Sequence, residues 1–158
     1  MGNKDSQSAL RLVPYETGHA MDMIENPKNL TYFYRKALEE FKNLGLGFTL
    51  LDGDRPVVCG GIIIVWEGVG VLWVFGKREN IYTEPILEAI KIYLSVTAES
   101  NHIHRLQVSS AEIHRNFYEC LGFSCESIMQ NCGPKGENYL MMRRLFDTNR
   151  GEGVQNDS

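Results

Sequence analysis

The stretch NFYECLGF, Asn116–Phe123, has the pattern of a helix end, a glycine stop and the start of a strand. The helix expected from Ser110 to Leu121 has an apolar stripe spaced four residues apart, made of Ile113, Phe117 and Leu121. Tyr118 is offset from Phe117 by about 100° around the helix axis. Its ring therefore belongs at the edge of the core, where the hydroxyl either faces a cleft or ends a packed side chain at water.

The segments on either side of this helix predict an α+β chain. The expected strands are 11–15, 47–51, 57–65, 69–75, 103–108, 123–130 and 138–145. The expected helices are 16–26, 29–45, one that starts near Thr83, and the helix that SSAE (109–112) opens with capping-box spacing. Residues 76–82 are expected to be a loop, and the strands 57–65 and 69–75 to pair as antiparallel neighbours. This order predicts a mixed sheet of six or seven strands with about four helices on its two faces.

Composition bounds the class of protein. The chain has 158 residues and is expected to form one domain over 10–146, with a flexible N-terminus at 1–9 and a flexible tail at 147–158. A formal net charge of −4 argues against a general nucleic-acid binder, which normally presents a basic face. The longest apolar run, VVCGGIIIVW, is too short to span a bilayer, so no membrane partner is expected. The four cysteines form no C-x-x-C pair and no signal peptide is visible, so the expected compartment is cytoplasmic, with reduced thiols.

Metal and thiol chemistry are weaker interpretations of the same sequence. His102 and His104 alternate along an expected strand, but zinc requires three or four ligands and no further one is evident beyond His114. No metal is therefore predicted. Cys59 and Cys120 lie in apolar surroundings and are expected to be small core residues rather than nucleophiles.

The order of elements together with the motif FYECLGF resembles the GNAT superfamily, the GCN5-related N-acetyltransferases, from about Leu12 to Leu145. In that family the segment A-x-x-x-Y-x-x-x-G-F closes the acetyl-CoA site, and its tyrosine donates a proton to the departing CoA sulfur. Tyr118, Gly122 and Phe123 match this segment. The resemblance implies an acetyl-CoA-dependent N-acetyltransferase with Tyr118 as general acid and an amine acceptor that the sequence does not identify.

The resemblance also implies where the cosubstrate binds. In the family, the sheet splays between the strand that contains Trp73 and the strand 104–108, and acetyl-CoA inserts there like an additional strand. The implied pantetheine contacts are the backbone groups of Leu72, Trp73, Val74 and Phe75, and the implied pyrophosphate contacts are Gly76, Lys77, Arg78 and the helix start at Thr83. The family's first two helices flank the acceptor cleft, which places Tyr32, Tyr34 and Arg35 near the acceptor. The nearest candidate for a general base is Glu67, in a turn.

A departure from the family pattern and a second resemblance keep an alternative open. The family's glycine-rich pyrophosphate loop corresponds to GKRENIYTEP (76–85), which has only Gly76, so Lys77 and Arg78 would have to hold phosphate by charge. The group Cys59-Gly60-Gly61, Trp73, Lys77 and His114 resembles a phage subgroup of GNAT-like proteins that includes internal virion proteins. The alternative is therefore a catalytically degenerate GNAT-fold phage protein, located in host cytoplasm or virion, that acts as a virion or interaction component. The partners considered for the chain, besides its substrates, are a virion protein or a second copy in a homodimer.

Overall fold

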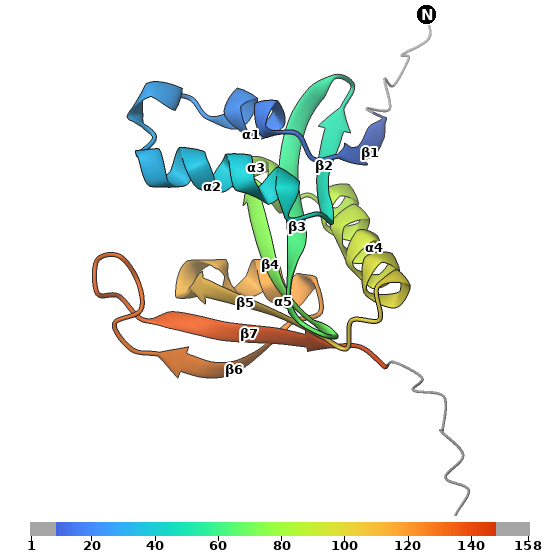
Figure 1. Ribbon diagram of the computed structural model, residues 1–158, viewed down its shortest axis with the longest axis vertical. Helices are drawn as coiled ribbons and strands as arrows, with labels where there is room; N and C mark the ends of the chain where they lie inside the picture. The colour runs from blue at the N-terminus through green and yellow to red at the C-terminus, as the bar shows by residue number, and fades with distance from the viewer. Residues whose placement is uncertain (1–8, 148–158) are drawn as a thin grey trace, which may run out of the picture.

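The computed structural model describes residues 9–147, which form one seven-stranded sheet with helices on both faces (Figure 1). The strands are β1 (Leu10–Pro14), β2 (Gly47–Asp52), β3 (Arg55–Trp66), β4 (Val69–Gly76), β5 (Arg105–Ala111), β6 (Ser124–Met129) and β7 (Tyr139–Leu145). Their order in the sheet is β1-β2-β3-β4-β5-β7-β6. All neighbours are antiparallel except β4 and β5, which are parallel. The predicted α+β fold with six or seven strands is confirmed.

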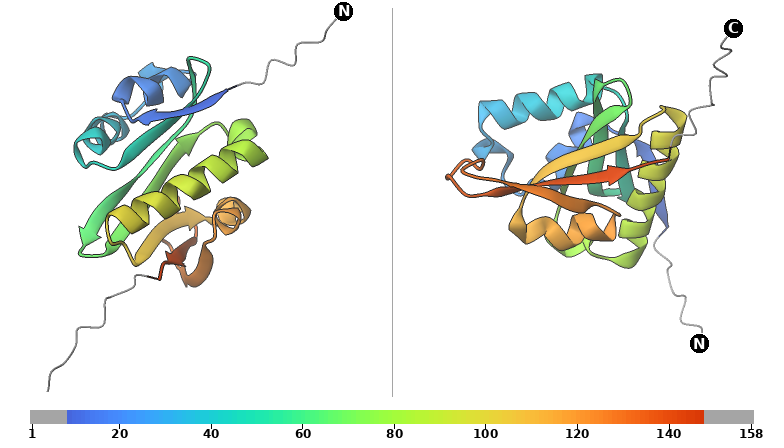
Figure 2. Two further views of the ribbon diagram at one scale, coloured as in Figure 1. Left: turned by 90° about the vertical axis from the view of Figure 1, so that its right-hand side faces the viewer. Right: turned by 90° about the horizontal axis from the view of Figure 1, so that it is seen from below.

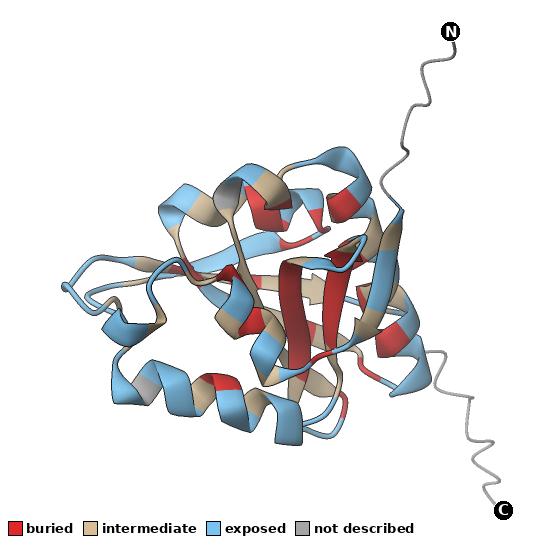
Figure 3. Ribbon diagram, turned by 90° about the horizontal axis from the view of Figure 1, so that it is seen from above, coloured by how far each residue is buried: buried red, intermediate tan, exposed pale blue. Residues whose placement is uncertain are grey.

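The helices lie in two layers on opposite faces of the sheet (Figure 2). The α-helices are α1 (Thr17–Met23), α2 (Tyr32–Asn43), α3 (Arg78–Ile81), α4 (Glu84–Ser100) and α5 (Arg115–Cys120), and short 3-10 turns occupy Pro27–Asn29 and Glu112–His114. The helices α1 and α2 cover β3 and β4 through a core that contains Met23, Leu38 and Trp73. The larger core lies on the other face, where α4 and α5 pack against the strands through Ile90, Leu94 and Phe117 among others. Buried residues are accordingly concentrated in the central strands (Figure 3).

Local sequence signals explain several of these elements. The Thr31 hydroxyl caps α2 by accepting the backbone N–H of Tyr34 at 3.4 Å. Pro85 lies in the first turn of α4, where its missing N–H costs no hydrogen bond. Gly122 ends α5 with a φ of +90°, a conformation that favours glycine and turns the chain into β6.

Some sequence-based expectations were wrong. The residues Ser109–Ala111 do not open a helix, because they continue β5 and pair with β7 up to Ala111 and Tyr139. The helix therefore begins later, and Ile113 is 56% exposed instead of contributing to a buried stripe. Long-range strand pairing here overrides a local capping pattern.

Other corrections concern single residues. His102 and His104 precede β5 instead of alternating along it, and His102 has a positive φ in the turn after α4. Cys120 is exposed, whereas Cys59 is buried as expected, and the four cysteines are unpaired. No helix within residues 9–147 is long and apolar enough to cross a membrane. The expected flexible ends lie largely outside the described residues.

Candidate active site

The strands β4 and β5 separate partway along their length (Figure 1). Their parallel pairing joins only Val69–Val71 to Arg105–Gln107. Beyond this point Leu72–Gly76 remain paired with β3, and Val108–Ala111 remain paired with β7. The two facing edges therefore present backbone N–H and C=O groups with no strand between them, and an extended ligand can pair with such edges. The predicted splay is confirmed.

The four predicted residues of β4 turn their side chains away from this opening. Leu72 and Val74 join the core under α4, whereas Trp73 and Phe75 join the core under α1 and α2. Trp73 is fixed there by stacking on Phe41, with ring centroids 4.4 Å apart. What these residues offer a ligand at the splay is therefore their backbone.

Tyr118 on α5 places its hydroxyl between the two diverging segments. The residue is 8% exposed, and its ring packs edge-on against Phe117 and Phe123, at centroid distances of 5.0 and 5.9 Å. The Ser110 side chain is a hydrogen-bond partner of the hydroxyl, and Tyr82 packs edge-on against the neighbouring Phe117 with ring centroids 5.9 Å apart. Because Ser110 lies on the part of β5 that is not paired with β4, and Tyr82 lies in the connection that follows β4, the Tyr118 hydroxyl is at the splay.

The surroundings of Tyr118 keep its hydroxyl protonated. Burial raises the pKa of Tyr118 to about 12, Tyr82 adds to the rise, and the hydrogen bond from Ser110 opposes it. The phenol is thus a neutral hydrogen-bond donor throughout the physiological pH range. A buried donor of this kind can protonate a leaving group or stabilise charge that develops on it.

Sequence reasoning missed Ser110 and Tyr82 as neighbours of Tyr118. Ser110 was assigned to the start of a helix, although the alternation of Leu106, Val108 and Ser110 favours a longer strand with these three side chains on one face. No local signal points to Tyr82, since its position depends on how the chain between β4 and α4 folds.

That connection is a turn of helix instead of the expected open loop. The helix α3 directs Ile81 into the core, where it is 7% exposed. A Cβ on Gly76 would lie 2.7 Å from Cγ2 of Ile81, so packing alone requires glycine here. The backbone N–H groups of Asn80 and Ile81 both donate to the Lys77 carbonyl. These donors are used inside the connection and do not form an open phosphate cradle.

The first turn of α4 still offers backbone donors at this end of the splay. The first intrahelical bond runs from the Leu87 N–H to the Thr83 carbonyl at 3.0 Å, so the N–H groups of Glu84 and Ile86 precede it. Thr83 is the N-cap by position, but its hydroxyl donates to the Asn80 carbonyl and does not cap the helix. The predicted helix start is therefore confirmed, and its cap differs from the expected one.

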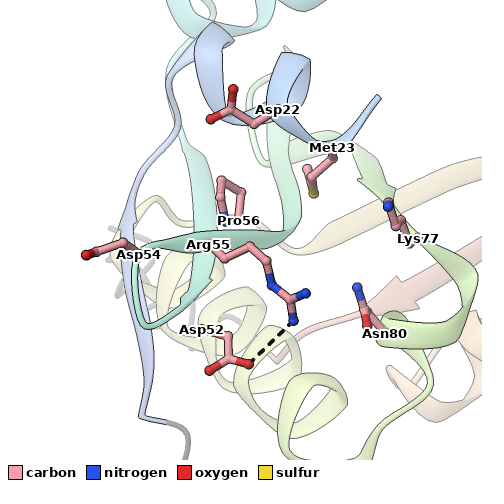
Figure 4. A pocket seen from close by; sticks show the side chains of 8 residues that line it. All are labelled: Asp22, Met23, Asp52, Asp54, Arg55, Pro56, Lys77 and Asn80. Atoms are coloured by element: carbon pink, nitrogen blue, oxygen red, sulfur yellow. Dashed lines mark ion pairs between the residues drawn. The ribbon is translucent and has the colours of Figure 1, made fainter. Parts of the chain in front are cut away.

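Lys77 points toward α1. Its Nζ lies 3.9 Å from Oε1 of Glu25, and its side chain helps to line a pocket of about 500 Å³ (Figure 4). The pocket has a mixed charge and is lined by Asp22, Met23, Asp52, Asp54, Arg55, Pro56, Lys77 and Asn80. Any phosphate bound by Lys77 would compete with Glu25. The side chain of Arg78 lies outside the described part of the structure.

The remaining predicted residues lie away from Tyr118. Glu67 is exposed in the turn between β3 and β4, and Leu72 lies three residues, roughly 10 Å, beyond the start of β4 at Val69. Tyr32 is 78% exposed on α2, and Arg35 donates to the Pro27 carbonyl at 3.0 Å. Over residues 9–147, no group of three or more His, Cys, Asp or Glu side chains is arranged to hold a metal ion.

Comparison with known proteins identifies solved structures that share this fold. No protein-family model and no curated protein matches the sequence. Among solved structures, Ard1 from Thermoplasma volcanium superposes with a TM-score of 0.74 at 9% identity, covering 89% of this chain and 99% of that one. A GNAT-family acetyltransferase from Streptococcus pneumoniae gives 0.62 at 15% identity, covering 88% and 100%. RimL, a ribosomal L7/L12 α-N-protein acetyltransferase in complex with coenzyme A, gives 0.66 at 10% identity, covering 89% and 96%.

These similarities establish the fold and not the activity, because proteins that share a fold at such low sequence identity can catalyse different reactions. The phage subgroup and the virion partner that the sequence suggested find no support among these structures. The splay, the helix start after β4 and the tyrosine of α5 occur together within an architecture that spans nearly the whole of each matched chain. The protein therefore has the GNAT acetyltransferase fold.

Proposed function

We propose that the chain is an acetyl-CoA-dependent N-acetyltransferase with an amine acceptor and with Tyr118 as general acid. The position of the Tyr118 hydroxyl carries this proposal: it is buried, protonated and located between Ser110 and Tyr82 at the splay. The GNAT-type fold supports acetyl transfer as the reaction class. A phenol held only for packing would not need its hydroxyl at the one place where two strands separate.

The residues present fit a pantetheine arm. Acetyl-CoA, when bound, supplies a thioester that is activated toward amines. The open edge of Leu72–Phe75 provides alternating backbone donors and acceptors, which can pair with the amide groups of the arm as a further strand would. This pairing fixes the position of the reacting carbon relative to β4, and positioning contributes a large part of the rate of a two-substrate reaction.

The proposed proton transfer uses Tyr118 alone among the protein side chains. The acceptor nitrogen forms a bond to the acetyl carbon while the carbon–sulfur bond breaks, and Tyr118 donates its proton to the departing sulfur. The nitrogen loses one proton in the same reaction, and one proton returns from solvent to the phenolate. We assign the proton loss of the amine to solvent instead of Glu67, because Glu67 lies in the hairpin turn before β4, and the first residue of that strand, Val69, is already roughly 10 Å along it from Leu72 at the splay.

The pyrophosphate is proposed to bind at the start of α4. The Glu84 and Ile86 N–H groups are the backbone donors there, the Thr83 hydroxyl lies beside them, and the positive end of the helix dipole favours an anion. Lys77 contributes charge from the adjacent connection. The carboxylate of Glu84 in the same turn works against this binding, so we expect weaker CoA affinity than a glycine-rich loop would give.

Calorimetric titration with acetyl-CoA tests the proposal, combined with measurement of the thiol released in the presence of amines. We expect saturable binding and acceptor-dependent thiol release. Absence of both heat and thermal stabilisation at millimolar acetyl-CoA would contradict the enzyme assignment. The same result would favour the second candidate, an interaction protein with the acetyltransferase fold, which the closed connection at α3 supports.

A further inference from the structure

The face of β5, β7 and β6 that points away from α5 carries no helix in the described structure. The left panel of Figure 2 shows α1 and α2 on one side of the sheet and α5 on the other, beside the C-terminal strands. Along β5 and β7 the buried residues Leu106, Val108, Leu140 and Met142 alternate with partly exposed ones. The partly exposed side chains of these strands therefore face the same side as α1 and α2, and we call this surface the open face.

Two polar side chains of the open face lie level with the point where the splay begins. Val71 is the last residue of β4 paired with β5, and its partner is Gln107. The partner of Gln107 on β7 is Arg143. Side chains of directly paired residues have Cβ atoms about 4.5–5.5 Å apart, so Gln107 and Arg143 are neighbours beside the opening.

The Gln107 side chain is held in one orientation by its neighbours. Nε of Arg105 donates to Oε1 of Gln107 at 3.0 Å, and Nη2 of Arg105 donates to Oε2 of Glu126 at 2.6 Å. Because the side-chain carbonyl oxygen of Gln107 accepts from Arg105, the amide N–H groups of Gln107 are directed away from Arg105 and can donate to another group. Glu126 is the only carboxylate in β5, β6 and β7, and Arg105 neutralises it.

Arg143 differs from the other arginines of this part of the sheet. Arg105 is paired with Glu126, and Arg144 on the opposite face donates to the Leu121 carbonyl and to the Ser95 hydroxyl. For Arg143, the described residues 9–147 supply no hydrogen-bond or ion-pair partner, although it is partly buried. A partly buried guanidinium without a counterion is suited to bind an anion, in particular the planar pair of oxygens of a carboxylate or phosphate.

We propose that Gln107 and Arg143 form a site for an oxyanion that is part of the acceptor molecule. The acceptor is then a small amine that also carries a carboxylate or a phosphate, and binding of this group at the open face directs the amine toward the splay. Polyamines are poor acceptors, because their charge has the same sign as Arg143. This inference rests on the proposed acetyltransferase function and specifies its substrate class.

The first experiment compares amines of matched size that differ in the anionic group. Thiol release from acetyl-CoA is measured with β-alanine against propylamine, with phosphoethanolamine against ethanolamine, and with spermidine. We expect at least one oxyanion-bearing amine to exceed its matched neutral partner by about tenfold or more in kcat/KM, the effect of a hydrogen bond to a charged group. The two pairs distinguish carboxylate from phosphate. Equal use of the matched amines, or a preference for spermidine, overturns the proposal.

The second experiment locates the preference. The variant Arg143→Gln is expected to lose most of the advantage of the oxyanion-bearing amine, and Arg143→Lys to retain part of it. The control Arg11→Gln removes an arginine from the opposite edge of the sheet, where it pairs with Asp54, and is expected to leave the preference unchanged. Retention of the full preference in Arg143→Gln overturns the proposal. Thermal unfolding of each variant verifies that it is folded.

A binding measurement separates failure of this inference from failure of the proposed function. The NMR signal of the Arg143 side-chain Nε–H group is followed in wild-type protein titrated with phosphoethanolamine, β-alanine and propylamine, without acetyl-CoA. We expect the first or second ligand, but not propylamine, to shift this signal more than that of Arg11. If acetyl-CoA does not bind but this shift occurs, the oxyanion site stands and the transferase does not. If neither anionic ligand shifts the signal, the oxyanion site is refuted whatever the result with acetyl-CoA.

Discussion

The two connections that border the splay are built differently. On the β5 side, the chain passes from a strand into α5 and presents a buried, protonated tyrosine next to Ser110. On the β4 side, the chain folds back as α3, uses the N–H groups of Asn80 and Ile81 internally and pairs Lys77 with Glu25. The β5 side, proposed for the chemistry, is therefore dry and preorganised. On the β4 side, proposed for phosphate binding, the N–H groups of Asn80 and Ile81 and the ammonium of Lys77 already have partners within the protein.

The difference indicates that acetyl-CoA recognition in this chain depends more on the strand edges than on the phosphate end. Backbone pairing along Leu72–Phe75 needs no particular side chain, so the pairing survives sequence change as long as the splay exists. A phosphate cradle, in contrast, needs glycines, and this connection has only Gly76, which serves packing against Ile81. The four predictions below test this contrast.

The largest expected effect is that of Tyr118→Phe on turnover. Loss of the proton donor should lower kcat by about 100-fold or more, with acetyl-CoA affinity nearly unchanged, because the backbone edges that bind the arm remain. The matched control is Tyr93→Phe, which removes the hydroxyl that donates to the Leu46 carbonyl under α4 and should leave kcat unchanged. Steady-state kinetics measures kcat, and calorimetry measures the affinity for acetyl-CoA. Equal turnover in Tyr118→Phe and wild type would mean that the β5 side does not supply the proton donor.

A second prediction uses alkaline pH to test whether Tyr118 on the β5 side is dry, with the buried thiol of Cys59 on β3 as a second group that titrates in the same range. Burial raises the pKa of Tyr118 to about 12 and that of the Cys59 thiol to about 11, both above their unfolded values. The stability from these groups is fully present below the unfolded pKa values and is lost as the pH rises through the folded ones. The free energy of unfolding should therefore fall by about 2–3 kcal/mol per group between about pH 9 and 12.

Urea unfolding at a series of pH values measures this loss. Tyr118→Phe should reduce the fall between about pH 10 and 12, and Cys59→Ala should reduce it between about pH 9 and 11. Only the pH dependence is compared, since both substitutions also change packing. A fall of the same size in Tyr118→Phe and wild type would mean that Tyr118 is hydrated.

The sequence predicted those parts of the site that are determined by local sequence pattern. The strands around Trp73 and the position of Tyr118 near the end of a helix follow from periodicity, and the splay beside them was implied by the family resemblance that the motif FYECLGF carries. Ser110 was misassigned because pairing with β7, far along the chain, extends β5 over a capping pattern. The helix α3 was missed because it has only four residues, and among those with described side chains Ile81 alone is anchored in the core.

Residues that acquire their role from tertiary structure were also beyond sequence reasoning. Gln107 and Arg143 are significant because no helix within residues 9–147 covers their face of the sheet and because the β5–β7 register makes them neighbours. Neither fact is encoded within a short window of sequence. Lys77 was identified from its charge, but its partner Glu25 lies some fifty residues earlier in the chain, so the sequence did not indicate the competition.

A third prediction concerns the packing of the closed connection. Gly76→Ala places a Cβ 2.7 Å from Cγ2 of Ile81 and 3.2 Å from Cγ2 of Val58, so we expect a loss of about 1–3 kcal/mol in stability. The control Gly18→Ala adds a methyl group to α1 with no atom within 4 Å, and should raise stability by about 0.5–1 kcal/mol. Urea unfolding measures both. Neutral behaviour of Gly76→Ala would mean that α3 detaches readily and that the connection can open for a phosphate.

The smallest expected effect is that of Glu25→Gln on acetyl-CoA affinity. Removal of the carboxylate releases Lys77 from an exposed ion pair of 3.9 Å, so stability should change by less than about 1 kcal/mol. The released ammonium can then interact with phosphate, and the dissociation constant of acetyl-CoA should fall by about twofold to fivefold at low salt, with a smaller effect at high salt. The control Glu40→Gln breaks the comparable pair between Glu40 and Lys36 on α2 and should not change the affinity. If Glu25→Gln has no effect while Lys77→Gln weakens binding, Lys77 already contacts phosphate in the wild-type complex. The ion pair with Glu25 then does not prevent the connection after β4 from binding phosphate.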